Sequence, residues 1–178
     1  MIRLFAALAI PYDIAEHLAG RQSGIPDARW RPADALHITL RFFGDIPENQ
    51  AEDVASELAR AAVAPLSLTL NGVGAFGEGS NIEAIWAGVQ ANPLLGVLAG
   101  RCEAAARRAG LKPDTRVYKP HVTLAYLRRP DPARVAGWIQ ANSLLKSPPF
   151  TLGAFGLYSS RQTSEGSRYD LEQVYPLR

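Results

Sequence analysis

Two short stretches of the sequence decide the fold: Leu36–Phe43 reads LHITLRFF, and Pro120–Leu127 reads PHVTLAYL. In each, a histidine and a threonine stand two residues apart within a run of alternating apolar residues. The two histidines, His37 and His121, lie 84 positions apart in a chain of 178 residues. Alternation with period two is typical of a strand with one buried face. The spacing, close to half the chain, indicates an internal duplication.

Strand and helix patterns flank the two motifs in the same order. Each half predicts a strand, a helix, the motif strand, a second helix and two further strands. In the first half these segments are Arg3–Ile10, Tyr12–Ala19, Leu36–Phe43, Glu48–Val63, Leu66–Gly74 and Ile82–Val89. In the second half they are Ile85–Val89, Pro93–Arg108, Pro120–Leu127, Ala133–Ala141, Phe150–Gly156 and Tyr169–Leu177.

The strand expected at Ile82–Val89 belongs to both halves, because it ends the first unit and begins the second. This overlap favours an exchange of strands between two lobes, and no Pro/Gly/Ser-rich linker separates them. We therefore expect one α+β domain, residues 1–178, built from intertwined repeats of roughly 1–84 and 85–178. The expected architecture is a duplicated two-lobe fold, with two antiparallel-type sheets backed by helices around a central cleft and related by a pseudo-twofold axis.

Composition excludes several classes of protein. With 47% hydrophobic and 20% charged residues, the chain has the composition of a folded globular protein rather than of a disordered one. The single cysteine, Cys102, excludes an intrachain disulfide and a Cys-rich zinc site. The apolar stretch Ile2–Pro11 is too short to span a bilayer and lacks a small-residue cleavage site after it. We expect a cytoplasmic protein that does not engage a membrane.

Each motif puts an imidazole and a hydroxyl on one face of its strand. Because side chains alternate between the two faces, His37, Thr39 and Arg41 are expected to share one face. The other face, expected in the core, holds Leu36, Ile38, Leu40 and Phe42. The same alternation places His121 and Thr123 together in the second copy. If a pseudo-twofold axis relates the lobes, the two imidazoles flank one small volume.

Two imidazoles at one site suit proton transfer at phosphorus. One can take a proton from the nucleophile and the other can give one to the leaving oxygen, because the ordinary pKa of histidine lies near neutral pH. The threonine hydroxyls can donate hydrogen bonds to phosphate oxygens. Metal binding is the competing use, but zinc takes three or four ligands, and no third ligand follows either histidine on its face. The remaining histidine, His17, has no counterpart and is expected at the surface.

The doubled motif resembles the 2H phosphoesterase superfamily, and within it the RNA 2′,3′-cyclic phosphodiesterases once called 2′-5′ RNA ligases. The resemblance rests on His37-Ile38-Thr39-Leu40 and His121-Val122-Thr123-Leu124. It extends to their flanks, Arg3–Ala7, Leu36–Gly44, Lys119-Pro120, Tyr169–Leu171 and Pro176-Leu177. It implies hydrolysis of a 2′,3′-cyclic phosphate on an RNA end or nucleotide to a 2′-phosphate, without metal or cofactor. We expect no obligate protein partner. It also implies that His37 is the proton donor and His121 the proton acceptor.

One position departs from this family pattern. Some members carry a phosphate-binding arginine five residues after the second histidine, where this chain has Tyr126. We expect Arg128 or Arg41 to bind the phosphate instead, together with the two motif threonines. The aromatic residues expected to stack on a base are Phe43, Tyr126 and Tyr158. Three functions compete: the cyclic phosphodiesterase, a related cyclic-nucleotide or 2′-5′ ligation reaction, and a nucleotide-binding module without turnover.

Overall fold

Ten strands and four α-helices make up the computed structural model, which describes all 178 residues. The strands are β1 (Ile2–Ala9), β2 (Arg29–Trp30), β3 (His37–Ile46), β4 (Leu66–Leu68), β5 (Leu70–Phe76), β6 (Ala84–Val89), β7 (His121–Tyr126), β8 (Phe150–Leu152), β9 (Ala154–Thr163) and β10 (Gly166–Pro176). The helices are α1 (Tyr12–Ala19), α2 (Glu48–Leu58), α3 (Pro93–Arg108) and α4 (Pro132–Asn142). Two 3₁₀ turns, η1 (Ala33–Ala35) and η2 (Gly79–Asn81), complete the chain.

The two motif strands join two antiparallel halves of the main sheet. Its strand order is β10-β9-β1-β3-β7-β6-β5, with β2 added beside β7. Strands β3 and β7 pair only at Ile38 and Val122, whereas β1 pairs with β3 over most of its length. The sheet is therefore two lobes, β10-β9-β1-β3 and β7-β6-β5 with β2, that meet at the His-x-Thr motifs.

Residues that are equivalent in the two repeats pair with each other. Ile38 pairs with Val122 in the main sheet, and Ser67 pairs with Thr151 in the separate β4-β8 sheet. Both pairs have the 84-residue offset that separates the two histidines. An antiparallel pairing of equivalent residues is what a twofold axis through the pair produces, so these two pairs mark the pseudo-twofold axis.

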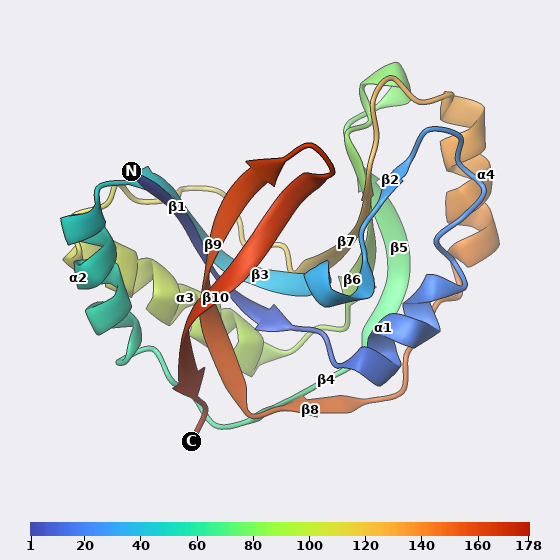
Figure 1. Ribbon diagram of the computed structural model, residues 1–178. Coiled ribbons are helices and arrows are strands. Elements are labelled where there is room, and N and C mark those ends of the chain that lie inside the picture. Colours follow the sequence, from blue (N-terminus) through green and yellow to red (C-terminus); the bar gives the residue numbers. More distant parts are fainter.

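Each repeat contributes strands to the other lobe. Strand β5, late in the first repeat, pairs with β6, and β9, late in the second, pairs with β1. The helices divide in the same way: α2 and α3 lie on one side of the molecule, and α1 and α4 on the other (Figure 1). The β9-β10 hairpin rises between these two sides, and the β4-β8 pair runs below it (Figure 1). Forty-one buried hydrophobic residues form one continuous core cluster.

The structure agrees with the expected segments and refines their ends. Helix α2 ends at Leu58 rather than Val63, because the chain turns there and buries Ala61 and Val63 in the core. Each of the two long strands expected after the second helices is split, so that its first residues form the small β4-β8 sheet. Strand β2, which pairs with the end of β7, was not expected.

Local signals explain where the helices of the second repeat begin. The Asn92 side chain accepts hydrogen bonds from the backbone N–H groups of Leu94 and Leu95, and Asp131 accepts one from Ala133. Each cap is followed by a proline at the first helical position, where a missing N–H costs least. None of the helices combines the length and the apolar character needed to cross a membrane.

Candidate active site

Both motif strands carry a β-bulge immediately after the threonine. In β3, Thr39 pairs with Ala7 and Arg41 pairs with Ala6, so the residue between them, Leu40, has no partner of its own. In β7, Thr123 pairs with Trp86 and Ala125 with Ile85, which leaves Leu124 unpaired at the equivalent place. An extra residue shifts the alternation by one. Side chains beyond each bulge therefore change faces.

This change of face corrects two expectations about the phenylalanines. Phe42 was expected in the core, but its side chain is 41% exposed and lies on the histidine face beside His37 and Thr39. Phe43, expected to stack on a base, is buried in the core at 7% exposure. In the second copy the same shift exposes Tyr126. Phe42 and Tyr126 are thus equivalent residues, each five positions after its histidine.

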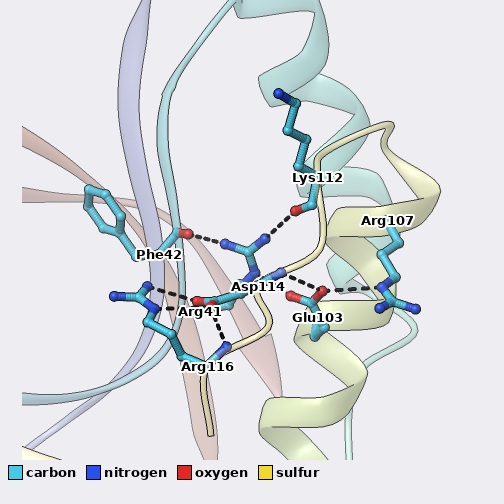
Figure 2. Close-up of polar contacts among 7 residues, drawn as sticks. All are labelled: Arg41, Phe42, Glu103, Arg107, Lys112, Asp114 and Arg116. Atoms are coloured by element: carbon cyan, nitrogen blue, oxygen red, sulfur yellow. Dashed lines mark hydrogen bonds and ion pairs between the residues drawn. The ribbon is translucent and has the colours of Figure 1, made fainter. Parts of the chain in front are cut away.

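The bulge also removes Arg41 from the histidine face, which corrects its expected place beside the phosphate. The Arg41 side chain is only 10% exposed and pairs with Glu103 of α3, with Nε 2.5 Å from Oε2. It also donates to the backbone carbonyls of Phe42 and Lys112. Figure 2 shows this guanidinium between β3, α3 and the loop that leads to the second motif. Arg41 therefore holds this loop in place.

The same loop contacts the first motif at a second point. Tyr118 lies three residues before His121, and its hydroxyl donates to the carbonyl of Thr39 at 2.9 Å. Because Ile38 pairs with Val122 in antiparallel register, the residues on either side of this pair, His37, Thr39, His121 and Thr123, adjoin the one point where β3 and β7 pair. A charge on His121 is close enough to His37 to lower its pKa. Both motifs therefore lie at the junction of the lobes.

Each imidazole is fixed by the same local hydrogen bond. His37 Nδ1 lies 2.8 Å from the carbonyl oxygen of Ala35, and His121 Nδ1 lies 2.7 Å from that of Lys119. Because a carbonyl only accepts, Nδ1 carries the hydrogen in both rings. A neutral ring then has a free lone pair on Nε2. In His37 this atom lies 3.1 Å from Thr39 Oγ1, whose hydroxyl donates to it.

Apolar surroundings disfavour the charged form of both rings. His37 packs against Phe5 and Tyr169, with ring centroids 4.9 and 5.3 Å away. Burial, together with the charges of Arg31 and His121, lowers the pKa of His37 to about 4, although the hydrogen bond to Ala35 acts in the opposite direction. His121 packs against Phe76 and Trp86. Burial, with the charge of Lys119, lowers the pKa of His121 as well.

Gly74 allows Trp86 to take its place beside His121. A Cβ at position 74 would lie 2.4 Å from the indole ring, closer than any side chain tolerates. The indole lies across the strand at this point. Lys119 Nζ sits 5.1 Å from the centroid of the same indole, within range of a cation–π interaction. A positive charge is thereby held near the second histidine.

Two adjoining cavities open on the His37 side of the site, and neither is lined by His121 or Thr123. The smaller, about 190 Å³, is lined by Arg3, Phe5, His37, Thr39, Phe42 and Tyr126 among others. The larger, about 720 Å³, lies between β2 and the β9-β10 hairpin and includes Arg31. Arg128, an expected phosphate ligand, lines neither cavity. Tyr158, an expected stacking residue, also lines neither cavity, and its ring stacks on that of Phe5 at 5.4 Å.

The site residues that the sequence did not predict are those whose position depends on strand pairing. Arg31 follows a two-residue strand, too short for an alternation to be read, and Phe42 is displaced by the bulge. Tyr169 reaches His37 only through the β9-β10 hairpin. The groups that converge around the two imidazoles are hydroxyls, aromatic rings and cations. No group of three His, Cys, Asp or Glu side chains that could share a metal ion is found in the fold.

The comparisons with known proteins place the chain in a family. A family model described as the 2′-5′ RNA ligase superfamily matches residues 10–163, which include both motifs. The match spans most of the chain, and the chain therefore belongs to the 2′-5′ RNA ligase superfamily.

Individual relatives cover the chain to different extents. An RNA 2′,3′-cyclic phosphodiesterase of Archaeoglobus fulgidus is 26% identical over 177 residues, which are 98% of this chain and 99% of that protein. One from Geobacillus stearothermophilus is 34% identical over 105 residues, which are 58% of this chain but only 33% of that protein. The crystal structure of E. coli LigT complexed with 3′-AMP superposes with a TM-score of 0.79 at 26% identity, over 99% of this chain and 98% of the other.

Proposed function

We propose that this protein hydrolyses the 2′,3′-cyclic phosphate at an RNA end to a 2′-phosphate, with the two motif histidines as general acid and base. The observation that carries the proposal is the matched anchoring of the two rings. Each donates Nδ1–H to the carbonyl two residues before it, which leaves Nε2 as the reactive nitrogen of both. Full-length relatives named RNA 2′,3′-cyclic phosphodiesterase support the choice of substrate.

In the proposed step, His121 Nε2 takes a proton from water while the water oxygen bonds to phosphorus. The bond from phosphorus to the 3′ oxygen breaks, and His37 Nε2 gives its proton to that oxygen. Thr39 and Thr123 donate hydrogen bonds to the non-bridging oxygens as their charge grows. The product is a 2′-phosphate with a free 3′-hydroxyl. Exchange with solvent then returns a proton to His37 and removes one from His121.

The lowered pKa of His37 fits the role of donor. A half-buried imidazolium with a pKa near 4 is a stronger acid than one with an ordinary pKa, so it gives up its proton readily. His37 is neutral near pH 7 in the free protein, and it must be protonated before the step. The phosphodiester carries a negative charge, which raises the pKa of a neighbouring imidazole when it binds. Substrate binding therefore supplies the protonated form.

The first test removes each histidine in turn. We expect His37→Ala and His121→Ala each to lower the rate of 2′-phosphate release by roughly 10²–10⁴-fold, the usual contribution of a general acid or base. The matched control is His17→Ala, which removes an exposed histidine on α1 and should leave the rate unchanged. All assays contain EDTA, because the two imidazoles supply both proton transfers. Full activity of both motif variants, or activity restored only by a divalent metal, would contradict the mechanism.

A second assay separates donor from acceptor. A cyclic phosphodiester with a good leaving group in place of the 3′ oxygen needs no acid. It should restore turnover to His37→Ala but not to His121→Ala. The opposite pattern would exchange the two roles and keep the mechanism.

The family description favours one further reaction, ligation. A 5′-hydroxyl in place of water would form a 2′-5′ linkage with the same two histidines. Adding an RNA with a free 5′-hydroxyl to the assay and resolving the products by length measures this directly.

A further inference from the structure

The larger cavity, about 720 Å³, extends away from the histidines along the β9-β10 hairpin. It meets the smaller cavity, which contains His37, at four shared lining residues, Tyr126, Gln162, Ser167 and Tyr169. A ligand that occupies the smaller cavity can therefore continue into the larger one. A terminal nucleotide in the smaller cavity leaves the larger cavity free for the group to which that nucleotide is bonded.

Two arginines of the segment around β2 converge in the larger cavity. A Cβ at Gly166, in the turn of the hairpin, would lie 3.5 Å from Arg29 Nη2 and 3.8 Å from Arg31 Nη1. The two guanidinium groups thus approach one point on the hairpin from the opposite wall. Gly166 also has a φ of 112°, a conformation that favours glycine.

Arg31 is fixed at the junction of the two cavities. Its guanidinium lies 5.7 Å from the ring centroid of Tyr126 and 5.3 Å from that of Tyr169. It also donates to the carbonyl of Ser167 at 3.2 Å. Its charge lowers the pKa of His37, so the guanidinium lies near the first catalytic histidine. Two aromatic rings and a carbonyl hold Arg31 in place, and no carboxylate neutralises it.

Some charged side chains of the larger cavity have an ion-pair partner and others have none. Neither Arg29, Arg31 nor a third arginine of the wall, Arg168, forms an ion pair. The carboxylate of Asp170, which also lines the cavity, is held by Arg161 at 2.7 Å. Two further carboxylates, Asp34 and Glu165, line the cavity without an ion pair. No carboxylate of the chain therefore pairs with Arg29 or Arg31 where the two side chains converge at Gly166.

We propose that Arg29 and Arg31 bind the internucleotide phosphate on the 5′ side of the terminal nucleotide. This assignment rests on the proposed function, because it takes the cyclic phosphate to lie at the two histidines. Arginine suits the role because its planar fork binds phosphate oxygens in pairs. The site makes an RNA chain, rather than a cyclic mononucleotide, the preferred substrate.

The test compares three substrates that differ only beyond the reacting phosphate. They are adenosine 2′,3′-cyclic phosphate, the dinucleotide ApA with a 2′,3′-cyclic phosphate, and the same dinucleotide with an uncharged methylphosphonate linkage. We expect kcat/KM for the dinucleotide to exceed that for the mononucleotide by at least tenfold, since a hydrogen bond to a charged group contributes roughly 1.5–3 kcal/mol, which corresponds to about 10–150-fold. The methylphosphonate should lose this advantage. It should also lose the salt dependence that a phosphate contact brings.

Variants of Arg29 locate the effect. Arg29 is exposed on β2 and its side chain makes no hydrogen bond or ion pair, so Arg29→Gln removes no internal contact. We expect Arg29→Gln to lower the ratio of dinucleotide to mononucleotide kcat/KM roughly tenfold, with Arg29→Lys in between. The matched control is Arg134→Gln, which removes one exposed charge on α4 away from both cavities and should keep the wild-type ratio.

The outcomes separate the subsite from the reaction. Hydrolysis of both natural substrates with a ratio near one would overturn the subsite and leave the proposed function intact. A dinucleotide preference that survives the methylphosphonate linkage and Arg29→Gln would assign the contact to the base and overturn the phosphate assignment. Hydrolysis of neither natural substrate would overturn the proposed function, and the subsite with it.

Discussion

His37 and His121 are equivalent in sequence, yet their surroundings make them unequal. Both rings use Nδ1 to bind a carbonyl two residues earlier. Arg31 lies near the first ring, however, and Lys119 near the second. His37 also has Thr39 Oγ1 against Nε2, whereas no hydrogen bond holds Nε2 of His121. A duplicated motif supplies two copies of one group, and neighbours from elsewhere in the chain make them different enough for an acid and a base.

The two threonines give a prediction at this scale. Removing either hydroxyl, in Thr39→Ala or Thr123→Ala, should lower kcat/KM by roughly ten- to a hundredfold, because one hydrogen bond to a charged oxygen contributes roughly 1.5–3 kcal/mol. The loss should be larger for Thr39→Ala, because this hydroxyl also contacts His37 Nε2. Serine at either position keeps the hydroxyl and should keep most of the activity. Thr151→Ala, on β8 at the opposite end of the pseudo-twofold axis from the motifs, is the control, and full activity of both motif variants would show that the hydroxyls do not bind the phosphate.

At the scale of strands and helices, the paired bulges decide which side chains reach the site. Without a bulge, Arg41 and Ala125 would lie on the histidine face, and the equivalent pair Phe42 and Tyr126 would point into the core. With the bulge, the Arg41 side chain instead connects β3 to α3 and to the loop Leu111–Pro120. That loop is also held by Glu103, which accepts from the backbone N–H of Asp114 at 3.1 Å (Figure 2). The strand of one motif thus positions the segment that leads into the other.

This role of Arg41 predicts a loss of stability. In Arg41→Met the aliphatic bulk remains, but the nearly buried guanidinium and its bonds to Glu103 and Lys112 are lost. We expect the free energy of unfolding to fall by about 1.5–3 kcal/mol, the cost of losing a hydrogen bond to a charged group. Activity should fall only a few-fold, through displacement of the loop before His121.

The control is Arg107→Met, which removes an exposed ion pair to the same carboxylate and should cost less than about 1 kcal/mol. Denaturant unfolding and kcat/KM are measured for both variants. A hundredfold loss of activity in Arg41→Met with unchanged stability would show that Arg41 binds the phosphate and does not act by holding the loop.

The sequence predicted the repeats, and with them most of the fold, because the residues that begin and end each helix and strand are local signals. Helices α1 and α3 have the expected bounds, Tyr12–Ala19 and Pro93–Arg108, since apolar spacing and a proline define them. The bulges left no such signal, because an alternating strand sequence looks the same with or without a bulge until its partner strand is known. Residues Arg29–Arg31 were missed for a related reason: a two-residue strand is defined by its partner β7 and not by its own pattern.

At the scale of the whole molecule, the twofold arrangement places the site where the two lobes meet. The motif strands form a β-pair at one position only, so the imidazoles lie at a junction that neither repeat forms alone. Burial at this junction lowers the pKa of both rings and so disfavours their charged forms. The site and the stability of the fold are therefore linked through the protonation of the histidines.

This linkage predicts how stability depends on pH. The pKa of His37 is about 4 in the folded protein and about 6.5 in an unfolded chain. Between these values the unfolded chain binds more protons than the folded one, so stability rises with pH. As the pH falls from 7 to 4, His37 should cost the fold up to about 3 kcal/mol. His121 adds a loss in the same direction, because its pKa is also lowered.

The measurement is the free energy of unfolding in denaturant at pH 7, 5.5 and 4, for the wild-type protein and for His37→Gln. The substitution removes the titrating ring, so the variant should lose about 3 kcal/mol less than the wild type over this range. Carboxylates whose pKa values are lowered by arginines, such as Asp114 beside Arg116, destabilise both proteins alike and cancel in the comparison. His17→Gln, on the exposed face of α1, controls for the loss of a histidine as such. Parallel curves for the wild type and His37→Gln would show that His37 is not held neutral by burial, and the argument for a strong acid at this position would fail with it.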